Sequence, residues 1–283
     1  MGRIRKGWEL TKKAWGVVRA NPSLLRLPIY GGLLAFVALV VFGAPAAYLL
    51  GASEEPTTAQ QVGGGALGLL ALYLASFSVI FFNVALAAAA DRSFQGEEAD
   101  TSYGIAVAKT RLGVIAAWAL VAGLVSLFFA ILRDRGGLAG QIAAGIGAAI
   151  WSLITFLVIP VLAFEGIGPF AAIKRSSSLF KDRWGQQITG NIAIGLITAM
   201  FFILGAVIAA AGGYILVTGS AAAAIAGGGL LVGGLIVVLV SVVVSGAVRG
   251  VFGVALYHYV AENQTIGPFS TADLEDAVKV KPA

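Results

Sequence analysis

The sequence predicts an all-α membrane protein, a single polytopic domain of about six transmembrane helices with amphipathic helices at the cytoplasmic interface. Of its 283 residues, 59% are hydrophobic and only 12% are charged, and the mean hydropathy is +0.92. A soluble domain has about 25% charged residues, so this chain lacks the charge to cover a water-facing surface. Its 38 glycines are typical of membrane helices that pack closely.

Six apolar stretches are long enough to cross the hydrocarbon core, which needs about 20 residues. They are residues 28–50, 66–90, 112–132, 138–164, 188–217 and 225–260. The amphipathic segment 1–27 is longer than the short basic head of a signal peptide, so we expect the first span to be retained. The last two stretches are long enough to tilt, kink or break, and residues 261–283 form a hydrophilic tail.

The positive charges predict the orientation of the chain. Segment 51–65 contains Glu54 and Glu55 but no Lys or Arg, whereas segments 1–27 and 91–111 on either side of it carry seven and three Lys and Arg residues. With both ends of the chain in the cytoplasm, all of the 19 Lys and Arg residues lie in cytoplasmic segments except Arg133, Arg135 and Arg249. The positive-inside rule therefore predicts cytoplasmic N- and C-termini.

Two cytoplasmic segments are predicted to form helices that lie flat on the membrane. In the first, apolar residues recur at three- and four-residue steps among basic ones, which places Trp8 and Trp15 at headgroup depth. The recurring positions are Ile4, Trp8, Thr11, Trp15 and Val18. Segment 169–187 is similar, with Trp184 near its end. Basic residues beside apolar runs indicate anionic membrane lipids as partners and not nucleic acid.

Short motifs recur along the chain. Leu10-x-Lys12-x-x-Trp15-Gly16 is repeated as Leu179-x-Lys181-x-x-Trp184-Gly185, and Ile167-Gly168-Pro169-Phe170 as Ile266-Gly267-Pro268-Phe269. We interpret these as three modules, each an interfacial helix followed by a pair of spans. A further helix after Pro268 would begin with Ser270-x-x-Asp273 as a capping box.

The stretch from Pro160 to Gly185 resembles a known family of membrane proteins. It combines Pro160 and Glu165 with Ala172-Ile-Lys174-Arg175-Ser176 and then Trp184. This pattern is similar to that of uncharacterised prokaryotic six-span membrane proteins, and to the related membrane domain attached to some glycerophosphodiester phosphodiesterases. The resemblance implies a multi-pass protein of a prokaryotic cell membrane. It brings no activity, because the soluble phosphodiesterase module is absent.

Arg249 interrupts the sixth apolar stretch. If Tyr257, His258 and Tyr259 form an aromatic belt at the cytoplasmic interface, Arg249 lies roughly 12–15 Å inside it at 1.5 Å per residue. The arginine also continues a row of mostly small residues at four-residue spacing, which predicts that it faces protein or a cavity. The other members of the row are Gly229, Gly233, Val237, Ser241, Ser245 and Gly253.

An ionisable residue inside a membrane is a candidate functional site. We expect Arg249 either to pair with Asn83, Asp91 or Glu165 and so hold the bundle together, or to contribute to a substrate or ion path. These four residues form the candidate intramembrane polar site.

Two of them have further interpretations. Glu165 lies at the mouth of the fourth span, where it could bind a cation or form an ion pair with Lys174 or Arg175 of the next helix. Asn83 is suited to an interhelical hydrogen bond.

Other residue types predict no catalytic, cofactor-binding or metal site. The chain has no cysteine and a single histidine, His258, which excludes thiolate and histidine-rich metal sites. No glycine cluster has the ending that a phosphate-binding loop requires. We therefore expect a structural or accessory membrane protein and no enzyme. The alternative is a channel or transporter for a small solute or lipid-like molecule, with its polar site around Arg249. Glycine-rich faces also permit a homo-oligomer or a membrane-protein partner.

Overall fold

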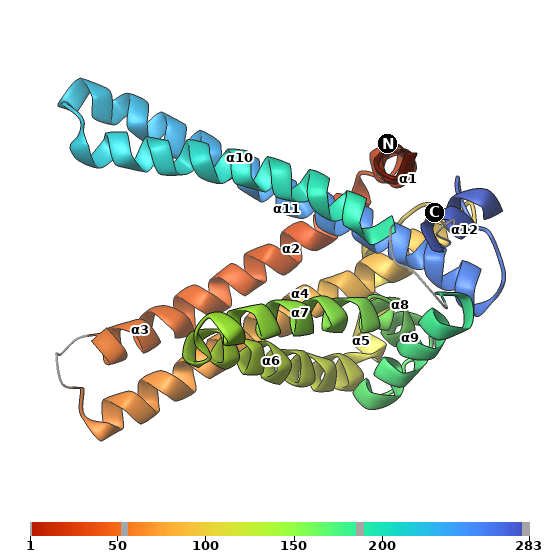
Figure 1. Ribbon diagram of the computed structural model, residues 1–283, viewed down its shortest axis with the longest axis horizontal. Helices are drawn as coiled ribbons and strands as arrows, with labels where there is room; N and C mark the ends of the chain where they lie inside the picture. The colour runs from red at the N-terminus through yellow and green to blue at the C-terminus, as the bar shows by residue number, and fades with distance from the viewer. Residues whose placement is uncertain (1, 52–55, 185–189, 279–283) are drawn as a thin grey trace.

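All regular elements in the described residues 2–51, 56–184 and 190–278 of the computed structural model are helices (Figure 1). Six helical segments are long and apolar enough to cross a membrane, as predicted. They are Ser23–Gly51, α4 (Thr58–Phe94), α6 (Leu112–Arg135), Gly137–Phe164, residues 199–218 of α10 (Gly190–Thr218) and residues 223–261 of α11 (Ala221–Ala261). The chain is therefore a multi-pass membrane protein.

Two of the six segments are interrupted near prolines. The first consists of α2 (Ser23–Ala38), a π-helical turn (Leu39–Gly43) and α3 (Ala44–Gly51). The π-helical turn directly precedes Pro45, which lacks the N–H that would bond the preceding turn. The fourth segment divides into α7 (Gly137–Ile154) and α8 (Val158–Phe164), because the ring of Pro160 clashes with the carbonyl four residues earlier.

Short helices gather at one end of the molecule. They are α1 (Gly2–Ala20), α5 (Thr101–Thr110), α9 (Pro169–Trp184) and α12 (Thr271–Val278) (Figure 1). Together with α8, residues 84–94 of α4 and residues 247–261 of α11, they form what we call the base. The chain turns between spans at Gly136 and at residues 219–220 lie at the opposite end.

The core of the molecule lies in the base. Val84 to Ala90 of α4 are buried on every side of the helix, because alanine side chains let neighbouring helices approach from several directions. Residues 251–257 of α11 are likewise buried in succession. Helices α4 and α11 are longer than the predicted stretches 66–90 and 225–260, at 37 and 41 residues, and most of the added residues lie at the ends away from the base. Their base-side ends pack against protein.

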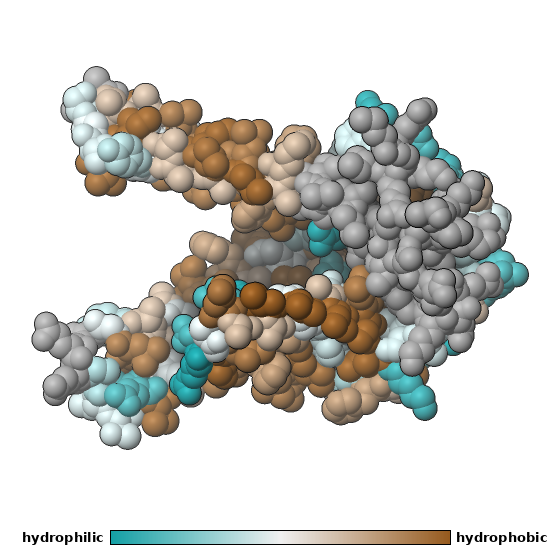
Figure 2. Space-filling model, viewed as in Figure 1, coloured by the Kyte–Doolittle hydropathy of each residue, from teal (hydrophilic) through white to brown (hydrophobic). Residues whose placement is uncertain are grey.

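Away from the base, the molecule separates into two arms. The α10–α11 hairpin diverges from the arm that contains α2, α3, α4, α6 and α7 (Figure 1). Figure 2 shows apolar surface on both arms and a notch between them. Most large apolar side chains of the arms are exposed, among them Leu124, Phe128, Phe201 and Leu239. Such exposure is expected where lipid, and not water, surrounds the helices.

Close backbone contact joins α10 to α11. A Cβ atom on Gly234 would lie 2.3 Å from the nitrogen of Ala209, and one on Gly212 would lie 2.3 Å from the nitrogen of Leu231. The predicted packing row is therefore wrong at its outer end, because a Cβ on Gly229 or Gly233 would meet nothing within 4 Å. The close contact with α10 is made instead by the neighbouring row of small residues, which contains Gly234.

Helix α12 docks on α1 through its first turn. The predicted capping box is confirmed, since Ser270 Oγ accepts from the Asp273 backbone N–H at 3.3 Å and the Ser270 N–H donates to the Asp273 carboxylate at 2.7 Å. The same carboxylate accepts a hydrogen bond from Lys13 of α1. Burial alone would raise the pKa of Asp273, but the hydrogen bonds from Lys13 and Ser270 outweigh it and lower that pKa.

The depressed pKa predicts that low pH weakens this contact. Asp273 titrates at a lower pH in the folded protein than in the unfolded one, so its contribution is complete above the unfolded value of 3.8 and is lost below it. Such a pair contributes up to about 1 kcal/mol, or roughly 2–4 °C in melting temperature. We expect Asp273→Asn to melt lower than wild type at pH 6, and this difference to shrink as the pH falls below 3.8. A difference that does not shrink would contradict this, and Asp134→Asn at the far end is the control.

Candidate functional site

Two adjacent residues of α11, Tyr257 and His258, connect the elements of the base. Tyr257 and Tyr259 are only 4% and 5% exposed, so the aromatic belt predicted from Tyr257, His258 and Tyr259 is wrong. These side chains are enclosed because the end of α11 is surrounded by α4, α8 and α12, and they do not mark a lipid interface.

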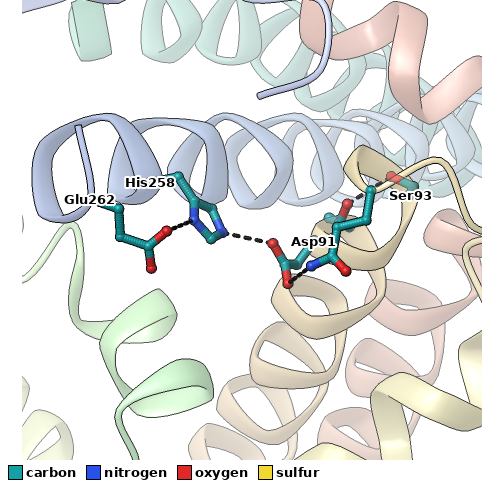
Figure 3. Close-up of polar contacts among 6 residues, drawn as sticks. Asp91, Ser93, His258 and Glu262 are labelled. Atoms are coloured by element: carbon teal, nitrogen blue, oxygen red, sulfur yellow. Dashed lines mark hydrogen bonds and ion pairs between the residues drawn. The ribbon is translucent and has the colours of Figure 1, made fainter. Parts of the chain in front are cut away.

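His258 joins α11 to the end of α4. Its Nε2 lies 2.7 Å from Asp91 Oδ1, and its Nδ1 lies 2.6 Å from Glu262 Oε2, one turn further along α11 (Figure 3). Gln95 donates from Nε2 to the second oxygen of Asp91 at 2.9 Å. An imidazolium would satisfy both carboxylates by donating from both nitrogens. The His258 side chain is 13% exposed, so the contact is largely shielded from solvent.

Tyr257 joins α11 to the turn between α8 and α9. Its hydroxyl donates to Glu165 Oε1 at 2.9 Å, and Arg175 Nε donates to the same oxygen at 2.9 Å. The hydrogen bond to Glu165 and its charge raise the pKa of Arg175 above its ordinary value. The predicted ion pair of Glu165 with Arg175 is thus present, whereas Lys174 is exposed.

The structure does not bring the four predicted polar residues together. Asp91 and Glu165 lie in the two separate contacts of His258 and Tyr257. Arg249 is exposed, and within the described part of the chain it has no ion pair or hydrogen bond. The predicted pairing of Arg249 with Asn83, Asp91 or Glu165 is therefore wrong. The carboxylates lie too near the base-side end of the helices, beside α9 and the last turn of α11.

Asn83 and the predicted tryptophan anchors occupy different settings. Asn83 is half-buried in α4, and no hydrogen bond joins it to another described residue. Trp8 is 44% exposed and Trp15 is 37% exposed on α1, and Lys12 lies over the Trp8 ring at 5.4 Å. The side chain of Trp184 lies outside the described residues.

One partly buried cation, Arg111, was not identified from the sequence. Arg111, at the junction of α5 and α6, has a buried Nε without a hydrogen-bond partner in the described structure. Its guanidinium packs on Gly166, where a Cβ would lie 2.1 Å from Arg111 Nη1. Gly166 also has a φ of +62°, which glycine adopts without strain. The glycine in the Glu165-Gly166 turn is the signal that indicates this close approach.

The described residues contain no group of three His, Asp or Glu side chains able to hold a metal ion. What the arrangement does is connect helices: each polar pair joins an element of the base to α11. The His258 side chain is largely shielded from solvent, whereas that of Arg175 is 39% exposed.

Comparison with family models matches residues 64–267 to DUF6159, a family of unknown function. The chain belongs to DUF6159. The matched part of this family member runs from the second span to the turn before α12, and it includes both polar contacts of α11. Neither curated proteins nor solved structures gave a match.

Proposed function

We propose that this protein is a non-enzymatic structural or accessory protein of a prokaryotic cell membrane. The observation that carries the proposal is the base, a closely packed helical body at one end of six spans. Its interior consists mainly of alanine, leucine, valine and aromatic side chains, and the contacts of His258 with Asp91 and of Arg175 with Glu165 join its elements. A rigid body of this kind suits the presentation of a surface to a partner or to lipid.

The proposal places the base in the cytoplasm, with both termini. The exposed basic side chains of α1 and α9, such as Lys12, Arg19 and Lys174, lie in the base, where they would attract anionic lipid headgroups. Apolar faces on the arms leave room for a second copy of the chain or another membrane protein.

Two further features support this interpretation. Each of α1, α5 and α9 precedes a helical hairpin, the order expected of three repeated modules. The resemblance to the membrane domain attached to some glycerophosphodiester phosphodiesterases also fits an accessory role, in which a membrane body works beside a separate catalytic partner.

A channel or transporter for a small solute or lipid-like molecule is the second candidate. The feature that favours it is a cavity of about 580 Å³ between α1, α10 and α11. Its walls are mainly apolar, which suits a lipid-like molecule better than a hydrated solute.

Reconstitution into vesicles separates the two candidates. We expect purified protein in phosphatidylethanolamine–phosphatidylglycerol vesicles to leave solute efflux and lipid flip-flop at the rates of protein-free vesicles. Flux that depends on the protein and is lost in Arg249→Gln would contradict the accessory role and favour transport. A variant with the matched charge change, Arg135→Gln, controls for altered reconstitution.

The orientation has its own test, which uses the absence of native cysteine. Glu98 and Asp134 are exposed at opposite ends of the molecule. We expect a membrane-impermeant maleimide to label Asp134→Cys on intact cells and to label Glu98→Cys only after lysis. The reverse pattern would place the base outside the cytoplasm.

A further inference from the structure

The cavity between α1, α10 and α11 is a groove that opens beside an arginine. Thr11 and Trp15 of α1 form one wall, Phe201 and Leu204 of α10 form the second, and residues 236–248 of α11 form the third. The few polar groups on its walls include Thr11, Ser241 and Ser245. Both Thr11 and Ser241 bond their own helices, to the carbonyls of Gly7 and Val237.

Arg249 lies at the flank of this groove. It follows Ser245 by one turn of α11, and four residues correspond to about 40° of rotation around the helix. Its side chain is exposed and has no partner in the described residues. A guanidinium is costly in the hydrocarbon, so an anionic partner near the headgroups would stabilise it, and the described residues supply none.

The position of α1 indicates the depth of Arg249 in the membrane. Thr11 and Trp15 of this amphipathic basic helix line the same groove as residues 236–248 of α11. A helix of this type lies at the boundary between headgroups and acyl chains. Arg249, one residue beyond Val248 toward the base, is therefore expected near headgroup level. The exposed Arg19 of α1 adds a second positive charge to this region.

We propose that the groove and Arg249 form a binding site for one anionic phospholipid. The phosphate accepts hydrogen bonds from the Arg249 guanidinium, a planar donor that matches phosphate geometry, and an acyl chain lies in the groove against Trp15 and Val244. The volume of about 580 Å³ falls within the range of ligand sites. The site goes beyond the accessory role, since it holds in either orientation and needs no protein partner.

The test is lipid binding by the purified, delipidated protein in a neutral detergent. Native mass spectrometry would compare phosphatidylglycerol with phosphatidylcholine of the same acyl chains. Both lipids carry a phosphate, but the choline cation of phosphatidylcholine competes with Arg249 for it, so we expect phosphatidylglycerol to bind at least about tenfold more tightly. Arg249→Gln should remove this preference, and Arg249→Lys should keep part of it.

Matched variants and ligands distinguish the site from general attraction to charge. Arg135→Gln, which removes the same charge at the far end, should keep the full preference for phosphatidylglycerol. Val244→Trp should weaken the binding of both lipids, because the larger side chain fills the groove. Glycerol phosphate, which has the headgroup charge without chains, should not compete. Equal affinity for the two lipids, an unchanged preference in Arg249→Gln, or competition by glycerol phosphate would each overturn the proposal. Because no flux is measured, its failure is separate from that of the proposed function.

Discussion

Replacing Gly234 by leucine is expected to separate α10 from α11. A Cβ at this position already lies 2.3 Å from the backbone nitrogen of Ala209 and 2.7 Å from its Cα atom, and backbone atoms cannot move aside as a side-chain end can. The helices must part by more than the width of a methyl group. Overpacking of this kind costs about 3 kcal/mol, and the loss should appear as a lower melting temperature in detergent.

The neighbouring glycine provides the control. Gly233 is exposed, and a Cβ there would meet nothing within 4 Å, so Gly233→Leu should melt within a few degrees of wild type. If both variants lose stability equally, the cause is the leucine itself and not the contact with α10. Limited proteolysis would show whether the loss is confined to the α10–α11 arm.

Gly104→Ala is expected to displace α5 from α4. The new Cβ would lie 2.3 Å from the carbonyl oxygen of Ala85 and 3.3 Å from the Cβ of Ala89. Both partners lie in the buried alanine run of α4, which leaves no space for adjustment. We expect the free energy of unfolding to fall by about 1–3 kcal/mol, as measured by denaturation in mixed micelles.

The same glycine-to-alanine substitution at an open position should raise the free energy of unfolding instead of lowering it. Gly113 lies in the first turn of α6, exposed and with nothing within 4 Å of its Cβ position. Alanine there reduces the freedom of the unfolded chain and should stabilise by up to about 1 kcal/mol. A neutral Gly104→Ala would show that the α4–α5 contact is looser than it is here, and an equally destabilised Gly113→Ala would show that the loss does not come from that contact.

The membrane spans and the contacts between residues close in the chain could be predicted from the sequence. Six apolar stretches of sufficient length can only be buried in a membrane, and Ser270-x-x-Asp273 specifies its cap within a single turn. The ion pair of Glu165 with Arg175 was also accessible, because it spans only ten residues and one turn of chain.

Contacts between residues far apart in the chain could not be predicted from the sequence in the same way. His258 and Asp91 are 167 residues apart, and nothing in their local sequence distinguishes an inward-facing imidazole from an interfacial one. On α11, two rows of small residues run side by side, one through Gly227 and Gly234 and the other through Gly229 and Gly233. Either row permits close approach, so only the position of α10 determines which row it packs against. In this arrangement Arg249 is exposed.

The continuity of α11 has a mechanical consequence. No break interrupts its 41 residues, which extend for about 60 Å at the usual rise, from the tip of one arm to the last turn beside Glu165 and Asp91. A continuous helix acts as a lever, so sideways pressure from the bilayer on the tip is transmitted along its axis. A sideways displacement of the tip is therefore expected to reach the Tyr257 and His258 contacts at the other end of the helix.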